Sequence, residues 1–181
     1  IPNGFDTDFW QDLGLERVKH SFISVATSTA SPARARVKGY DLIEELAASN
    51  PEWSFTLVGD SNYKPQSSNI QVFGKETAAS LVQRYNTHEF YLQLSSSEGF
   101  PNALGEAMAC GCVPIGSAVG AIPEIIGDTG LLLKRKELGT LQLHKAKQQL
   151  LGQVAISEEH NASQMLGFGK SLLLFDKIHT L

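Results

Sequence analysis

Two glutamates in one polar segment are the residues best suited to chemistry in this sequence. Glu98 and Glu106 are separated by seven residues within 95–124, which is SSSEGFPNALGEAMACGCVPIGSAVGAIPE. Pro101 marks the start of a predicted helix, because proline is tolerated in the first turn. Glu98 then lies in the preceding loop and Glu106 about one turn inside the helix, so both carboxylates can face a ligand above the helix N-terminus.

The start of the same predicted helix offers donors for an anion. The backbone N–H groups of Asn102, Ala103 and Leu104 are free donors of a first turn, and the helix dipole favours negative charge there. Amides donate to phosphate, whereas carboxylates accept hydrogen bonds from sugar hydroxyls. The combination predicts a site for a nucleotide sugar. Taken singly, each glutamate is more often a solvated residue or a complement to the helix dipole, so the interpretation depends on the surrounding motifs.

Basic residues earlier in the chain supply a second part of such a site. Lys38 precedes a predicted helix and follows Arg34 and Arg36. A cation at this place can bind a diphosphate and stabilise the charge on a leaving nucleotide. Without the two glutamates, Lys38 would be an ordinary exposed lysine.

Composition restricts the class of protein. The chain has 181 residues, of which 42% are hydrophobic and 19% charged, with a formal net charge of -4. These values are typical of one globular domain and argue against a disordered or coiled-coil chain. They also exclude a global basic surface for nucleic acid or an anionic membrane. Cys110 and Cys112 are too close for a disulfide and too few for a zinc site, so we expect small buried side chains.

Alternating strand and helix patterns predict the fold. Apolar runs predict strands at 21–27, 54–60, 70–74, 90–95, 113–117 and 130–133. Helical patterns lie at 40–48, 77–85, 102–110, 122–126, 138–151 and 158–178, and 28–39 is expected to form a loop. Such alternation indicates an α/β fold, with a doubly wound, mostly parallel sheet and helices on both faces. Ligands of these folds bind at the carboxyl ends of the strands.

Three motifs in order resemble one family. Glu98 and Glu106, followed by EAMACGCVPI and GAIPE, resemble its paired-glutamate signature. The first six residues, IPNGFD, resemble its interdomain segment I-x-N-G-V-D, and residues 37–41, VKGYD, resemble its KG-x-D motif. The family is the retaining glycosyltransferases of group 1, or family 4, type, and the similarity over roughly residues 1–133 is to their C-terminal, donor-binding domain. It implies a Rossmann-like domain that forms one half of a GT-B architecture.

The resemblance implies a reaction and roles for residues. The reaction is transfer of a sugar from a nucleoside diphosphate to an acceptor hydroxyl with retention of configuration. Glu98 would bind donor-sugar hydroxyls, Glu106 the ribose, and Lys38 with Arg34 or Arg36 the diphosphate. The expected catalytic residues are Glu98, Lys38 and Arg36. The expected donor-binding residues are Arg34, Gly74, Lys75, Gly99, Phe100, Asn102, Ala103, Leu104 and Glu106.

Two departures from the family pattern concern the phosphate site. The family often has Gly-Arg directly after its first strand, whereas this chain has Ala26-Thr27, so the guanidinium would come from Arg34 or Arg36. Pro101 replaces a common glycine and removes one N–H donor. The family uses Lys and Arg where other transferases use a divalent metal, so no metal and no cofactor are expected.

The resemblance also predicts context. Residues 1–181 would form a single nucleotide-sugar-binding domain with C-terminal helices at 138–181, without the N-terminal acceptor domain and without activity of its own. The surface around Glu98, Gly120 and Ala121 would then be open. Expected partners are a UDP- or GDP-sugar and, through the other domain, a glycan or lipid-linked acceptor, but no nucleic acid. The setting would be the cytoplasm or the cytoplasmic face of a membrane.

Two other functions stay open at this stage. The first is a nucleotide-sugar epimerase of related fold. The second is a nucleotide-binding or interaction domain without catalysis, against which the presence of both Glu98 and Glu106 argues.

Overall fold

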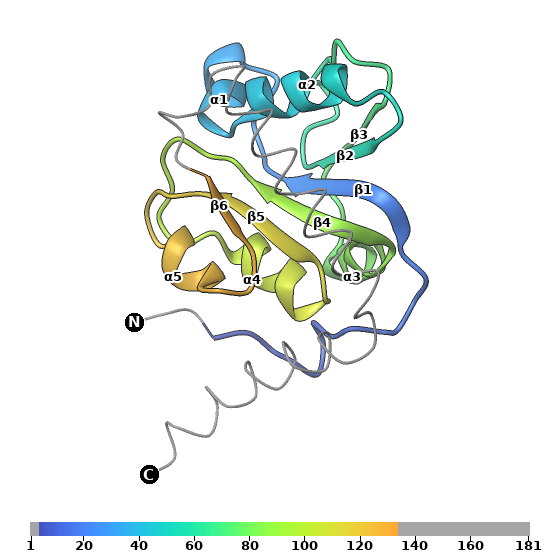
Figure 1. The fold of residues 1–181 in the computed structure, drawn as a ribbon, viewed down its shortest axis with the longest axis vertical. Helices are drawn as coiled ribbons and strands as arrows, with labels where there is room; N and C mark the ends of the chain where they lie inside the picture. The colour runs from blue at the N-terminus through green and yellow to red at the C-terminus, as the bar shows by residue number, and fades with distance from the viewer. Residues whose placement is uncertain (1–3, 134–181) are drawn as a thin grey trace. The chain divides into compact units, whose positions relative to one another are not determined.

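The computed structural model describes residues 4–133, which lie within one compact unit, Ile1–Arg135. Figure 1 shows them as a sheet between two layers of helices. The helices expected at 138–151 and 158–178 lie outside the described residues. The single domain over 1–181 therefore stays a prediction.

The sheet has six parallel strands in the order β3-β2-β1-β4-β5-β6. They are β1 Val18–Val25, β2 Ser54–Val58, β3 Ile70–Phe73, β4 His88–Gln93, β5 Val113–Ser117 and β6 Leu131–Leu133. This order confirms the predicted Rossmann-like α/β fold. The chain winds outward in one direction from β1 and in the other from β4, so the topological switch lies between these two neighbours.

Five helices connect the strands. They are α1 Pro32–Val37, α2 Tyr40–Ser49, α3 Ala78–Thr87, α4 Asn102–Ala109 and α5 Ile122–Ile126. Helices α1 and α2 lie on one side of the sheet and α3, α4 and α5 on the other (Figure 1).

The expectation of an unbroken loop over 28–39 is wrong. Helix α1 occupies Pro32–Val37, with Ser31 as N-cap and Pro32 in its first turn. Proline fixes the backbone angle that a first turn needs and lacks only an N–H that would have no helical partner there. Lys38 is the C-cap residue of this helix.

Aromatic rings fill the core between the sheet and helix α2. Phe22 pairs in register with Phe55 on β2 and with Phe90 on β4, and both ring pairs stack at 4.9 Å between centroids. Trp53 extends the stack at 5.0 Å from Phe22. These buried rings tie together the three central strands, including the two that flank the switch point.

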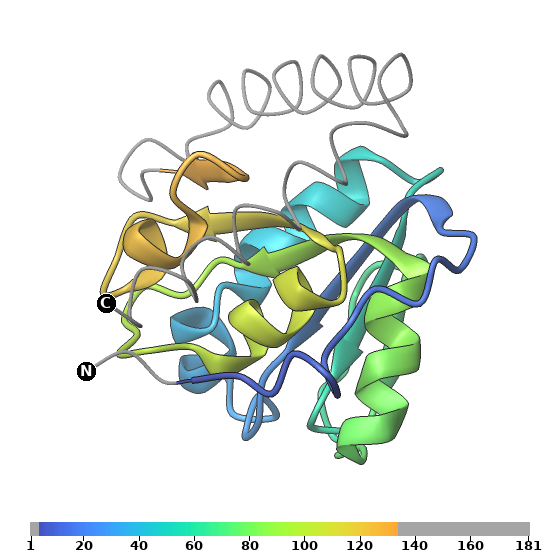
Figure 2. The same cartoon turned by 90° about the horizontal axis from the view of Figure 1, so that it is seen from below.

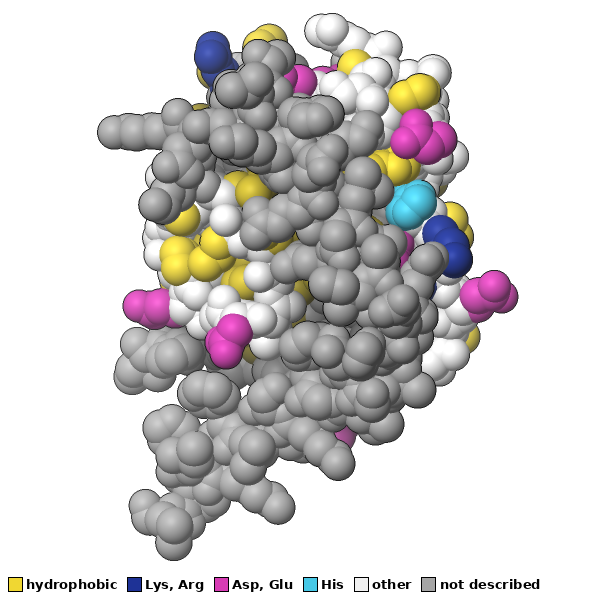
Figure 3. Space-filling model, in the orientation of Figure 1, with side chains coloured by type: hydrophobic (Ala, Val, Ile, Leu, Met, Phe, Trp, Pro, Cys, Tyr) yellow, Lys and Arg dark blue, Asp and Glu magenta, His cyan; other side chains and the backbone are white. Residues whose placement is uncertain are grey.

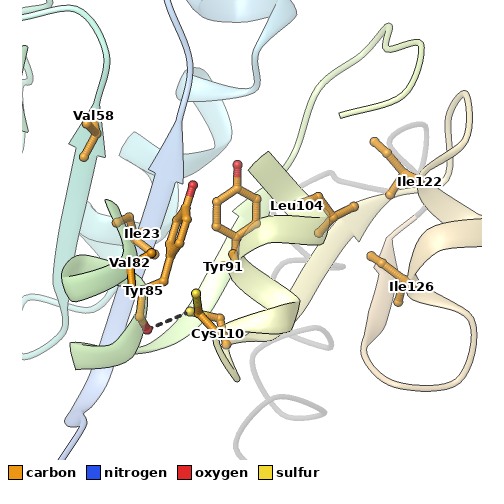
Figure 4. Close-up of a cluster of buried hydrophobic side chains, with 11 residues drawn as sticks. Ile23, Val58, Val82, Tyr85, Tyr91, Leu104, Cys110, Ile122 and Ile126 are labelled. Carbon is orange, nitrogen blue, oxygen red and sulfur yellow. Dashed lines mark hydrogen bonds between the residues drawn. The ribbon is translucent and has the colours of Figure 1, made fainter. Parts of the chain in front are cut away.

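The opposite face buries a second cluster (Figure 4). Tyr85 from α3 and Tyr91 from β4 meet edge to face at 5.9 Å, and neither ring is accessible to solvent. The predicted burial of Cys110 and Cys112 is confirmed. Burial raises the pKa of Cys110 to about 11 and that of Cys112 to about 12, so both thiols stay protonated at neutral pH.

The described N-terminal segment, residues 4–17, runs past α4 and α3 before β1 begins (Figure 2). Arg17 fixes it there: Nη1 donates to the carbonyls of Tyr85 at 2.8 Å and His88 at 2.7 Å, and Nη2 donates to that of Cys110 at 2.7 Å. These carbonyls belong to the C-terminal ends of α3 and α4, where helices leave acceptors without internal partners.

Candidate functional site

Two segments meet at the switch point of the sheet. The chain after β1 forms α1 and ends in Lys38, and the chain after β4 forms the loop that contains Glu98. Both segments therefore lie at the carboxyl ends of the two central strands, where open α/β sheets bind ligands.

Lys38 and Glu98 form an ion pair in this position. Lys38 Nζ lies 2.8 Å from Glu98 Oε1 and 3.1 Å from Oε2. Only 18% of the lysine side chain and 16% of the glutamate side chain are exposed. The structure thus brings together two of the residues that the sequence analysis assigned separately, one to the diphosphate and one to the sugar.

A glycine sets the distance between the two segments. Gly39 has a φ of 82°, and a Cβ there would lie 2.2 Å from the carbonyl oxygen of Leu94. Any other residue would strain the backbone and push the segments apart. Beside it, the N–H of Ser96 donates to the carbonyl of Val37 at 2.8 Å. Lys38 is therefore held between two backbone contacts to the Glu98 loop.

The Glu98 loop is also packed on its other side. Gly120 has a φ of 56°, and a Cβ there would lie 2.1 Å from the carbonyl oxygen of Glu98. The N–H of Ala121 donates to the Gly99 carbonyl at 3.2 Å. Gly120 is exposed and Ala121 half-buried, but the Glu98 side chain is mostly covered. The expected open surface is thus wrong for Glu98, because Lys38 lies against it.

Gln93 is a site residue that the sequence analysis missed. Its Nε2 donates to Glu98 Oε1 at 3.1 Å and to Ser95 Oγ at 2.9 Å, and its Oε1 accepts from the Tyr91 hydroxyl at 3.3 Å. The signal was a polar residue near the end of the apolar run FYLQL, because a buried amide in a strand needs partners.

The start of α4 differs in one respect from the expectation. The N–H of Leu104 donates to the carbonyl of Pro101 at 3.1 Å, so it is not the free donor that was predicted. Proline as N-cap supplies no side-chain acceptor, and a carbonyl three residues back satisfies Leu104 instead. Asn102 is exposed and Ala103 half-buried at the helix start.

Glu106 lies half-buried on α4, one turn from its start. Burial raises the pKa of its carboxyl. Burial also raises the pKa of Tyr91, and the charges of Glu106 and Glu98 add to that rise.

Arg34 and Arg36 are exposed in the last turn of α1. Arg36 Nε lies 3.7 Å from Asp41 Oδ2, with 80% of the arginine side chain exposed. Ion pairs of this kind are weak and exchange readily. Both guanidinium groups stay candidates for a diphosphate contact.

The other expected binding residues follow β3 or follow Glu98 in the chain. Gly74 follows β3, and its carbonyl accepts from the N–H of Gly59 at 3.2 Å, while Lys75 is exposed. Gly99 is exposed, and Phe100 stacks on Phe5 at 6.3 Å between ring centroids.

The sequence contains an Asp-x-Asp pattern, Asp6-Thr7-Asp8, which the expectation that no metal binds did not consider. Asp6 Oδ1 accepts the N–H groups of Asp8 at 3.1 Å and Phe9 at 3.3 Å, so this carboxylate closes a local turn. Within residues 4–133, no three His, Cys, Asp or Glu side chains gather in a way that could bind a metal ion.

Two surface properties of the described region can be compared with the composition: the spread of its basic side chains and the apolar length of its helices. On the face in Figure 3, the visible Lys and Arg side chains of the described region stand apart from one another. None of the described helices has the length and apolar character needed to span a membrane.

Comparison with known proteins places the chain in a family. The family model described as "Glycosyl transferases group 1" matches residues 29–153, more than half of the chain. N-acetyl-alpha-D-glucosaminyl L-malate synthase of Bacillus anthracis is 54% identical over 46 residues, which are 24% of this chain and 12% of that protein. The match thus spans a small part of the relative.

Solved structures share the fold. The pneumococcal O-GlcNAc transferase GtfA, in complex with UDP and GlcNAc, aligns over 90% of this chain and 34% of its own length, with 23% identity and a TM-score of 0.59. Sucrose-phosphate synthase from Thermosynechococcus elongatus aligns over 84% and 43%, with 23% identity and a TM-score of 0.63. The C-terminal domain of the group 1 family protein LpcC from Francisella tularensis aligns over 82% and 88%, with 21% identity and a TM-score of 0.60.

This chain therefore spans less than half of the first two proteins and most of an isolated C-terminal domain. The family match covers the Lys38 segment, both glutamates and the strands β2 to β6, but not β1. The chain belongs to the group 1 glycosyltransferases.

Proposed function

We propose that this chain is the donor-binding domain of a glycosyltransferase and binds a nucleoside-diphosphate sugar at the switch point between β1 and β4. The observation that carries the proposal is the approach of Lys38 Nζ to Glu98 Oε1 at 2.8 Å. An ammonium, which can bind phosphate, thus lies beside a carboxylate, which can accept hydrogen bonds from hydroxyls, in the loop before α4. A nucleotide sugar presents a diphosphate and hydroxyls with the same adjacency.

Lys38 acts on the diphosphate. Its ammonium, with Arg34 or Arg36 and the N-terminal end of α4, neutralises the charge that grows as the bond from the sugar C1 to the phosphate oxygen breaks. Such contacts accelerate the reaction only to the extent that they strengthen in the transition state. No metal or cofactor enters this proposal.

The glutamates act on hydroxyls. Glu98 accepts hydrogen bonds from the donor sugar, and Glu106 accepts them from the ribose. The acceptor oxygen attacks C1 on the face from which the diphosphate leaves, and its proton passes to the departing phosphate oxygen. Configuration is retained, and no enzyme nucleophile is needed. The nucleotide base lies toward Gly74 and Lys75 at the end of β3.

The remaining parts of the proposal concern the longer protein. Relatives carry more chain than this one, which supports a separate acceptor domain and no turnover by the 181 residues alone. The GtfA structure with UDP and GlcNAc supports a nucleotide-sugar donor. The acceptor is a glycan or lipid-linked sugar, at the cytoplasmic face of a membrane.

Calorimetric titration of the chain with UDP, GDP and ADP tests the proposal. We expect one nucleotide to bind and Lys38→Ala and Glu106→Ala each to weaken it by about tenfold or more, because each removes a charge-assisted hydrogen bond. Lys64→Ala, which removes an exposed lysine from the loop before β3, is the matched control and should change nothing.

Two results would contradict the proposal. The first is the absence of binding to any of the three nucleotides. The second is binding that neither Lys38→Ala nor Glu106→Ala changes, which would favour a ligand site elsewhere on a non-catalytic domain.

A further inference from the structure

The Glu98 carboxylate has donors of two kinds. Lys38 Nζ reaches both of its oxygens, at 2.8 and 3.1 Å, and Gln93 Nε2 reaches Oε1 at 3.1 Å. The lysine follows α1, a helix whose residues are mostly exposed. In contrast, only 6% of Gln93 is exposed. One donor is therefore at the rim of the site and the other is part of the buried sheet.

Gln93 is itself held in one orientation. The Tyr91 hydroxyl, which comes from the same strand β4, donates to Gln93 Oε1 at 3.3 Å. Because the amide oxygen faces Tyr91, the amide nitrogen faces Glu98 and Ser95. Hydrogen bonds thus connect Tyr91 through Gln93 to Glu98.

The surroundings of Gln93 are equally fixed. Its backbone pairs with Gly116 on β5, and Ser117 Oγ donates to the carbonyl of Gln93 at 3.4 Å and to that of Ser95. A buried amide with both ends bonded loses little further freedom when a ligand binds.

We propose that Gln93 is a positioning residue, which keeps Glu98 oriented for the donor sugar when Lys38 exchanges that carboxylate for the diphosphate. This inference rests on the function proposed above. Lys38 has one ammonium, and phosphate oxygens compete with the Glu98 carboxylate for its N–H donors. Once the lysine turns to the diphosphate, Gln93 is the side-chain donor that stays in contact with Glu98 among residues 4–133.

The consequence is a split between two ligands. A nucleoside diphosphate uses Lys38 but not Glu98, so Gln93 should hardly affect its affinity. A sugar nucleotide uses both, so it should lose affinity when Gln93 cannot hold Glu98. A residue that merely stabilises the fold would affect the two ligands equally.

The test compares UDP, GDP and ADP with UDP-N-acetylglucosamine, GDP-mannose and ADP-glucose by calorimetry on the full chain. For Gln93→Leu we expect about tenfold weaker binding of the sugar nucleotide and less than about twofold change for the matching diphosphate. Tyr91→Phe removes only the hydroxyl that orients the amide and should give a smaller split in the same direction. On a Glu98→Gln background, Gln93→Leu should add little.

Thr56→Val is the matched control. Thr56 is a buried polar strand residue, and its hydroxyl bonds His88 Nε2 at 2.8 Å, at the start of β4 rather than its end. It should lower stability without any split between the ligands.

Each result has one meaning. Equal losses for both ligands, or no loss for either, in Gln93→Leu and Tyr91→Phe overturn the positioning role while the proposed function stands. If the unsubstituted chain binds none of the six compounds, the proposed function fails and this inference fails with it.

Discussion

The two ends of the sheet each use one basic side chain to join distant segments, but with different partners. At the amino end, Arg17 donates to the backbone carbonyls of Tyr85, His88 and Cys110. At the carboxyl end, Lys38 donates to a single side chain, Glu98. Both basic side chains are largely buried, with 13% of Arg17 and 18% of Lys38 exposed.

The difference in partners separates structure from function. Backbone carbonyls at helix ends need a donor in the folded protein and cannot move away, so these three Arg17 contacts are permanent, beside a weaker ion pair of Arg17 Nη2 with Asp12 Oδ1 at 3.3 Å. A carboxylate at the edge of a sheet can exchange an ammonium for another donor, and the ammonium can then bind phosphate. Burial of a basic residue therefore does not by itself indicate a site, whereas an exchangeable partner at the carboxyl ends of strands does.

The largest effect should come from Arg17→Leu. It leaves three carbonyls without their donor and releases the N-terminal segment, so we expect a loss of about 3–5 kcal/mol in the free energy of unfolding. Urea denaturation measures it. Arg34→Leu, at an exposed position of α1, should stay within about 0.5 kcal/mol. Equal losses in the two variants would contradict the structural role of Arg17.

Gly39→Ala should have the next largest effect. A Cβ would lie 2.2 Å from the Leu94 carbonyl oxygen at a φ of 82°, so we expect a loss of about 2–3 kcal/mol. Gly14→Ala isolates the cost of a positive φ, because Gly14 has a φ of 66° and nothing within 4 Å of its Cβ position. It should cost about 1 kcal/mol.

Gly39→Ala should also weaken nucleotide binding, because it displaces the neighbouring Lys38, whose ammonium binds the diphosphate in the proposed function. Thermal denaturation and nucleotide titration of both glycine variants check this. Equal stability of the two variants would show that the backbones of the two segments do not pack as described.

Lys38→Met should separate binding from stability. We expect nucleoside diphosphate affinity to fall about tenfold or more. The free energy of unfolding should fall by only about 1–2 kcal/mol, because Gln93 still donates to Glu98. The double variant with Glu98→Gln removes the unpaired charge and should recover stability without recovering binding. Calorimetry and urea denaturation measure the pair, and recovery of both properties would contradict a role of Lys38 in phosphate binding.

The fold was predictable because the strands are short and apolar. The predicted strand 113–117 and helix 122–126 match β5 Val113–Ser117 and α5 Ile122–Ile126. Helix α1 was missed because six residues give too little periodicity, although Ser31-Pro32 is a helix-start signal. The predicted strand 21–27 begins late because Val18, Lys19 and His20 in β1 are not buried.

The sequence singled out Lys38 and Glu98 as candidates but did not predict the contact between them. Lys38 and Glu98 stood in separate motifs, and their ion pair depends on Gly39, whose close approach to Leu94 joins two segments far apart in sequence. Gln93 belongs to no motif, since a single amide in a strand reveals its partners only in three dimensions. The expectation of a free N–H at Leu104 was wrong because the carbonyl of Pro101 accepts its hydrogen bond.

Glu106→Gln should give the smallest effect and one of opposite sign. Burial raises the pKa of this carboxyl in the folded chain above its unfolded value near 4.5, so the folded state favours the protonated form. Its contribution to stability is present below that value and is lost as pH rises through the folded pKa. At pH 7 the charged carboxylate therefore costs stability, and glutamine should raise the free energy of unfolding by at most about 1 kcal/mol, since the side chain is only half-buried. Near pH 4 the variant and the unsubstituted chain should unfold alike.

Nucleotide affinity should fall in the same Glu106→Gln variant, so a residue that costs stability would be one that the site needs. Thermal denaturation across this pH range, with Glu45→Gln as a control on α2, measures the difference. A gain that is the same at pH 4 and pH 7 would show that charge burial at Glu106 is not its cause.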